Sequence, residues 1–433
     1  MRPGVDVISR ALPPPRSAPT DTGVAFLIGP TEQGDDVTLT HSLTEYVALL
    51  GDRSTGNEAT YDAADVYFRE GGAKLYVSRT NATDEEETEA PDETQLDSMT
   101  RSELDTYAAT QGLDPAEYGT KAELLAAVES RVSALPRTVD TGIQAALDAL
   151  NSDLGPGQVF IADATLAAVA DNQSALLAHA MNHNRVALLS CADGDLATLL
   201  AAGAALQTDA NARYGALFAP SAVVPGIVAG TTRVVPYAAV QAGIIARNDV
   251  LYNPNIAAAG ELGQAVYALD VNGRFTDIDY QSLNDGSVNM ARIVFGGVRT
   301  YGYRSCVDPV KVPEWLDFGW ARLNMGITAL AEGIGERYVF TQLDGRGRTM
   351  AQFGAELTAM LATFYDLGAL YGETAQDAYF VDVGSTINTP ETIANGELHA
   401  VLEVRMSPFA EWVVIEIVKV STLQALPAVT IAA

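Results

Sequence analysis

Short apolar segments alternate with helix-like segments along much of this chain. Residues 23–29 (GVAFLIG) are an apolar run bounded by Gly and Pro, which is typical of a buried strand. Helices are predicted at 43–50, 62–69, 139–150, 166–183 and 196–210, and further strands at 74–79, 158–162, 186–190 and 213–220. Ser42 or Thr44 can cap the first helix, and Gly71 and Gly72 end the second. Strand and helix alternation with short joints predicts a layered α/β region with a largely buried sheet.

An acidic segment interrupts this alternation. Seven of the ten residues 84–93 are Asp or Glu and none is basic, so residues 84–95 are predicted to be a solvated linker. The following segment, 96–133, has capping boxes at 100–103 and 120–123, with Gly112 between them. Two short capped helices joined in this way resemble the SAP, or helix-extended-helix, module. Such modules often bind nucleic acid, but residues 96–132 carry seven acidic and three basic residues, which favours a decorating insert.

The elements become fewer and longer after residue 293. Apolar residues at three- and four-residue steps predict two amphipathic helices. The first stripe is Trp320, Leu323, Ile327, Leu330 and Ile334, and the second is Phe353, Leu357, Met360, Leu361, Phe364 and Leu367. Strands are predicted after them at 378–383, 399–406 and 408–420. Residues 291–420 are therefore expected to form a compact α+β domain.

The last predicted strand and the two chain ends have unusual compositions. Apolar side chains lie on both faces of the strand, which indicates a central position in a covered sheet; they include Trp412, Val414, Ile415, Ile417 and Val418. Residues 421–433 have no charged side chain and end in VTIAA, so a free tail would be prone to aggregation and is expected to pair. Residues 1–20 contain five prolines, which predicts an extended arm or, alternatively, a disordered terminus.

The bulk properties exclude several classes of protein. The net charge of −29 argues against a nucleic-acid partner for the chain as a whole, because phosphate binding needs Lys and Arg. No signal peptide opens the sequence and no run of about 18 apolar residues predicts a membrane span. Cys191 and Cys306 lack metal-ligand spacing and are interpreted as reduced core thiols. These features predict a soluble protein made in the cytoplasm.

Candidate chemical motifs are few. His179 and His183 are spaced as a metal pair on a predicted helix, but no third ligand accompanies them, so two surface histidines are expected. Residues 344–348 (DGRGR) and 382–386 (DVGST) are interpreted as a polar loop and a strand exit rather than phosphate-binding turns. No nucleophile motif is present. The sequence therefore predicts no catalytic residue, cofactor site or metal site.

Short motifs occur in a fixed order at both ends of the chain. The front motifs are 2–7 (RPGVDV), 23–29 and 67–79 (YFREGGAKLYVSR). The back motifs are 297–302 (GVRTYG), Trp315, 322–324 (RLN), 369–372 (ALYG), 378–381 (AYFV), 388–389 (NT), 395–398 (NGEL) and 408–412 (PFAEW). In this order they resemble the contractile tail sheath proteins of phage tails and related contractile injection systems. Residues 340–344 (FTQLD) depart from the family's FEPN element. The match is good over 1–80 and 290–420 and looser over 140–290.

The resemblance implies a structural subunit rather than an enzyme. Such subunits polymerise as stacked hexameric rings around a tail tube and contract to drive it through a target cell envelope, without nucleotide, cofactor or metal. The implied partners are other copies of the chain, the tube protein, and baseplate and tail terminator proteins, in a virion tail sheath assembled in the host cytoplasm. No membrane insertion or direct nucleic-acid contact is implied. An α/β enzyme with an appended helical domain, or a nucleic-acid-associated protein acting through 96–132, are the alternatives.

The resemblance also assigns roles to the chain ends. Residues 1–20 and 421–433 are expected to be arms that add strands to sheets of neighbouring subunits. The arm residues are Pro3, Gly4, Val5 and Val7 at one end and Leu423, Leu426, Val429 and Ile431 at the other. Between the arms, residues 21–290 are expected to form the α/β domain, interrupted by the linker and the insert, and 291–420 the sheath domain.

Overall fold

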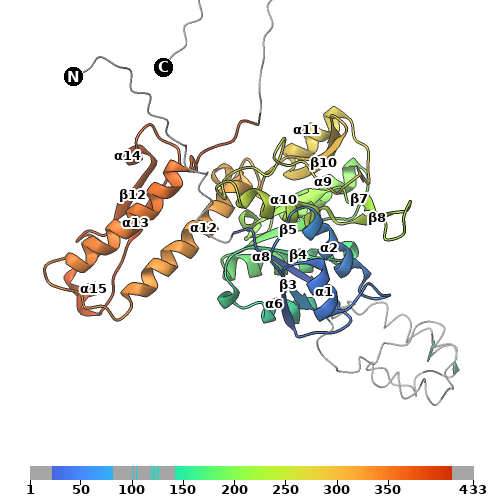
Figure 1. Ribbon diagram of the computed structural model, residues 1–433, viewed down its shortest axis with the longest axis horizontal. Coiled ribbons are helices and arrows are strands. Elements are labelled where there is room, and N and C mark those ends of the chain that lie inside the picture. The colour runs from blue at the N-terminus through green and yellow to red at the C-terminus, as the bar shows by residue number, and fades with distance from the viewer. Residues whose placement is uncertain are drawn as a thin grey trace, which may run out of the picture.

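The computed structural model describes residues 22–80 and 142–411, with a few positions between 101 and 125. The predicted arms, the acidic linker, nearly all of the SAP-like insert and residues 412–420 of the last predicted strand lie outside this part of the chain. Within it, Figure 1 shows a main domain and a smaller C-terminal unit, joined by the long helix α12 (Phe318–Gly335).

The main domain is built on an eight-stranded sheet in the order β11-β10-β6-β5-β4-β1-β3-β2. The six central strands, from β10 to β3, all run parallel to one another. The two edge strands, β11 beside β10 and β2 beside β3, are antiparallel to them. Their bounds are β1 Ala25–Gly29, β2 Val37–Thr40, β3 Leu75–Arg79, β4 Gln158–Ile161, β5 Val186–Ser190, β6 Gly215–Ala219, β10 Val288–Val294 and β11 Gly297–Tyr301.

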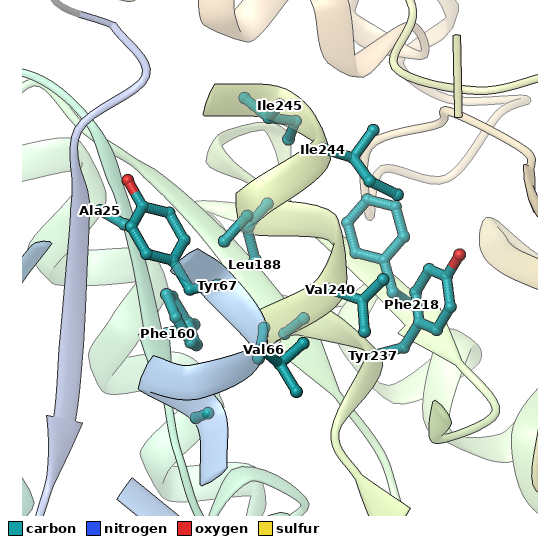
Figure 2. Packing of buried hydrophobic residues seen from close by; sticks show 14 of the residues in the cluster. Ala25, Val66, Tyr67, Phe160, Leu188, Phe218, Tyr237, Val240, Ile244 and Ile245 are labelled. Atoms are coloured by element: carbon teal, nitrogen blue, oxygen red, sulfur yellow. The ribbon is translucent and has the colours of Figure 1, made fainter. Parts of the chain in front are cut away.

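Helices cover both faces of this sheet, which is why its central strands are apolar on both sides. Along β1, Ala25 and Leu27 belong to one core and Phe26 and Ile28 to the other, because successive side chains point to opposite faces. The helices of the main domain are α1 Leu43–Leu50, α2 Glu58–Arg69, α6 Ile143–Ala149, α7 Ala164–Ala167, α8 Ala170–Asn182, α9 Leu196–Leu206, α10 Tyr237–Asp249 and α11 Asp277–Asp285. Figure 2 shows α2 and α10 packed together, with their side chains beside Phe160, Leu188 and Phe218 of the sheet.

The remaining elements of the main domain are short. A three-stranded sheet has the order β8-β7-β9. Its strands are β7 Ala222–Pro225, β8 Thr232–Val235 and β9 Asp270–Val271, and single 3-10 turns occur at Ser152–Leu154, Ala212–Tyr214, Pro313–Trp315 and Glu336–Tyr338. The Glu336–Tyr338 turn follows α12 and belongs to the C-terminal unit.

The C-terminal unit has a core of its own. Leu323 and Ile327 of α12 pack against Leu357, Leu361 and Phe364 of α13 (Arg348–Asp366), which confirms the two predicted helices. Its other elements are α14 Ala375–Ala378, β12 Tyr379–Asp382, α15 Pro390–Ala394 and β13 Val401–Val404. Strands β12 and β13 form an antiparallel pair that covers the helices.

The structure corrects several predicted boundaries. The helix predicted at 166–183 is two helices, α7 and α8, because the chain turns at Ala168 and Val169 and Asp163 caps the first of them. Helix α2 begins four residues before the predicted start. Residues 408–411, the beginning of the last predicted strand, are not in a strand. The predicted division after residue 290 falls inside β10, whose strand partners lie in the main sheet.

Candidate functional site

The predicted histidine pair has a structural role. The rings of His179 and His183 stack with centroids 4.4 Å apart, and Arg185 lies 2.8 Å from His179 Nε2. His179 is buried, so its predicted surface position is wrong. Burial, together with the Arg185 charge, lowers the pKa of His179 to about 3, which keeps the ring neutral. Nowhere in the described residues do three His, Cys, Asp or Glu side chains gather as a metal site would require.

The other chemical candidates are also explained by local structure. Asp344 accepts hydrogen bonds from the backbone N–H groups of Arg348 (2.7 Å) and Thr349 (3.3 Å), so it caps the start of α13. Cys191 and Cys306 are buried free thiols, as predicted, and burial raises the pKa of each to about 12. A thiol with so high a pKa is a poor nucleophile near neutral pH.

The two-stranded sheet of the C-terminal unit has open edges. No other described segment pairs as a strand with β12 or β13, and the single bridge between Leu370 and Met406 lies just beyond the end of β13. On its outer face Phe380 is 57% exposed and Val401 is 44% exposed. A strand edge with unpaired backbone groups beside exposed apolar side chains is a surface on which a further strand can add.

The two ends of the described main chain are both fixed to buried charged groups. Thr22 Oγ1 donates a 2.7 Å hydrogen bond to Asp249 Oδ2, and the same oxygen accepts one from Arg322 at 2.5 Å. At the other end, Arg304 binds the Glu411 carboxylate with two hydrogen bonds, of 3.0 and 2.6 Å. Such charge-assisted bonds are stronger than those between neutral groups. Residues 22 and 411, next to the predicted arm and strand segments, are therefore each bound to the main domain by side-chain hydrogen bonds.

Comparison with known proteins gives matches only at the level of structure. No family model and no curated protein matches the sequence. The contracted helical sheath of the anti-feeding prophage (AFP) is similar, with a TM-score of 0.62, 18% identity, and coverage of 96% of this chain and 98% of that chain. The contracted PVC sheath of an extracellular contractile injection system gives a TM-score of 0.60 at 17% identity, covering 98% and 99%. A sheath tail protein from Desulfitobacterium hafniense gives 0.50 at 12% identity, covering 88% and 93%.

This chain has the contractile sheath fold. The predicted resemblance is thus confirmed at the level of the fold, and the likeness includes the C-terminal unit as well as the main domain. The similar structures come from sheath and baseplate assemblies. None of the described helices combines the length and apolar character needed to cross a bilayer.

The residues assigned to the two arms and to the last strand remain predictions. Pro3 to Val7, Leu423 to Ile431 and the strand residues Trp412 to Val418 all lie outside the described residues. Sequence reasoning singled out Arg322 and Glu411 only as members of the motifs 322–324 and 408–412. It did not find their partners Asp249 and Arg304, because these are distant in the chain. The signal available was a charged residue inside an apolar stripe, as Arg322 is in α12.

Proposed function

We propose that this chain is the subunit of a contractile sheath. The observation that carries this proposal is the likeness to sheath proteins over nearly the whole of both chains. In the proposed assembly, copies stack as hexameric rings around a tube and shorten to drive the tube through a target cell envelope. Contraction releases energy stored in an extended state and needs no nucleotide or metal. The tube protein, a baseplate and a terminator protein are the proposed partners, within a phage tail or an injection particle.

We further propose that subunits are linked by strand exchange. The arms 1–20 and 421–433 of one copy would add to β12 and β13 of its neighbours, where backbone hydrogen bonds provide the connection and side-chain pockets set the register. The open edges of this sheet and the exposed Phe380 and Val401 support the proposal. So does the composition of residues 421–433, which lack charged side chains.

Deletion of residues 421–433 tests this linkage. We expect the truncated chain to fold as a monomer with the far-ultraviolet circular dichroism of the full chain, but not to form tubes in negative-stain microscopy. A synthetic peptide of residues 421–433, added in excess, should shorten the tubes of the full chain by occupying the acceptor edge.

A second deletion serves as the control. Replacing residues 96–133 by a short Gly/Ser linker removes more of the chain, but we expect tubes to form because that insert is a decorating element. Long tubes from the chain truncated at residue 420 would contradict the strand-exchange model while leaving the fold likeness intact.

A further inference from the structure

We propose that one buried junction, centred on Tyr303, binds the roots of both arms, which are residue 22 at the N-terminal end and residues 407–411 at the C-terminal end. The junction couples the two roots energetically, so that displacing one arm loosens the other. This inference rests on the proposed function, because it assumes that residues 1–20, before residue 22, and residues 421–433, beyond residue 411, act as arms. The junction itself consists only of described residues.

The N-terminal root reaches helix α12 through two hydrogen bonds. Thr22 is fully buried, and its hydroxyl donates to Asp249 Oδ2, at the last residue of α10. Arg322 of α12 is 1% exposed and donates to the same oxygen. Arg322 also donates to the backbone oxygen of Pro254 at 3.1 Å, which fixes the guanidinium on its other side. Residue 22 is therefore tied to a helix that is 300 residues away in the sequence.

The C-terminal root lies along the start of the same helix. A Cβ at Gly319 would lie 2.4 Å from the tip of the Phe409 ring and 2.4 Å from the backbone oxygen of Asn255, so this position requires glycine. The backbone oxygen of Ser407 accepts hydrogen bonds from Trp320 Nε1 (3.2 Å) and Asn255 Nδ2 (3.0 Å). The Arg304–Glu411 pair then fixes the last described residue.

Tyr303 joins the two roots. It is 4% exposed, and its hydroxyl accepts a hydrogen bond from Arg322 at 3.5 Å, on the side of the N-terminal root. Its ring packs edge-on against Phe409, with centroids 6.2 Å apart, on the side of the C-terminal root. The next residue in the chain, Arg304, holds Glu411. A continuous set of contacts thus runs from Thr22 through Asp249, Arg322 and Tyr303 to Phe409.

An ordinary buried ion pair would account for Asp249 and Arg322 alone. Such pairs contribute little net stability, because removing two charges from water costs about as much as their attraction returns. This pair differs from an ordinary one in its position, because it belongs to a network of hydrogen bonds and ring contacts that reaches both Thr22 and Phe409. Coupling between sites requires a shared element that both of them affect, and this junction supplies one.

Hydrogen exchange of the full-length monomer tests the coupling. In Asp249→Asn, we expect exchange to rise about tenfold both in segment 22–25 and in segment 405–411, since loss of a charged hydrogen bond has an effect of that order. Exchange in β5, at the centre of the sheet, should not change. If Asp249→Asn does not fold, Tyr303→Phe removes only the hydroxyl link to Arg322 and should still raise exchange in both segments by a few-fold.

Asp62→Asn is the matched control. Asp62 is buried to a similar degree and pairs with Arg233 between α2 and β8, away from both roots. We expect this variant to leave exchange in segments 22–25 and 405–411 unchanged. A rise in segment 22–25 alone, or an equal effect of Asp62→Asn, would overturn the proposed coupling. Because the measurement uses monomers, either result is independent of whether the arms exchange strands.

Discussion

The separate core of the C-terminal unit predicts that it can be destabilised alone. Leu361 of α13 is fully buried among α12, α13 and the small sheet. Replacing it with Ala removes its apolar contacts and leaves a cavity, which should lower the free energy of unfolding by about 3 kcal/mol. For a unit of about 90 residues, each kcal/mol lowers the melting temperature by roughly 4–8 °C. Leu361→Ala should therefore lower the melting temperature of this unit by about 12–24 °C.

Differential scanning calorimetry of the monomer measures this effect. We expect the wild-type chain to show separable transitions, with Leu361→Ala moving only the one assigned to the C-terminal unit. The matched control is Leu188→Ala in β5, which is buried to 1% exposure in the main sheet and should move only the other transition. A single transition shifted equally by both variants would refute the independence of the two cores.

Two further predictions concern buried carboxyl groups. Burial and the neighbouring Glu411 raise the pKa of Asp317 to about 6. The folded state therefore binds this proton more tightly than the unfolded chain does. The free energy of unfolding should rise by about 2–3 kcal/mol as the pH falls from about 7 to 4. Because His179 acts in the opposite sense, the test is the difference in urea unfolding between the wild type and Asp317→Asn, in which the Asp317 contribution disappears. The carboxylate of Glu70, which is fully buried, accepts backbone hydrogen bonds from Val266, Tyr267 and Ala268 at 2.8–3.2 Å. Glu70→Gln should lower the free energy of unfolding, measured with urea, by about 2 kcal/mol. Glu58→Gln, at an exposed site, should leave it unchanged. Equal effects of the two variants would contradict this account.

The elements that the sequence predicted well have strong local patterns. Strand β1 is an apolar run because both of its faces are covered, and α13 has a single apolar stripe because only one side is buried. Ser42 caps α1 with a side-chain bond to the Glu45 N–H, as its position before the helix indicated. In these segments local preference and final packing agree.

The elements that were missed are those whose environment comes from distant residues. Helix α10 was not predicted because it is buried on almost every side, so no polar face gives it a period. Strand β2 is a short, half-buried edge strand, and its pairing with β3 depends on a segment 38 residues away. The partners Arg322 and Asp249 are 73 residues apart. No local pattern indicates which buried charges meet.

Helix α12 has a mechanical consequence for any working sheath. Phe318, Ala321 and Met325, all in its first half, belong to the core of the main domain. Leu323, Ile327 and Ile334, which extend to its end, belong to the core of the C-terminal unit. A swivel between the two units would have to break backbone hydrogen bonds within this unbroken 18-residue helix. In the proposed sheath, each subunit should therefore move as a rigid body, and the change in shape during shortening should occur between copies rather than within one.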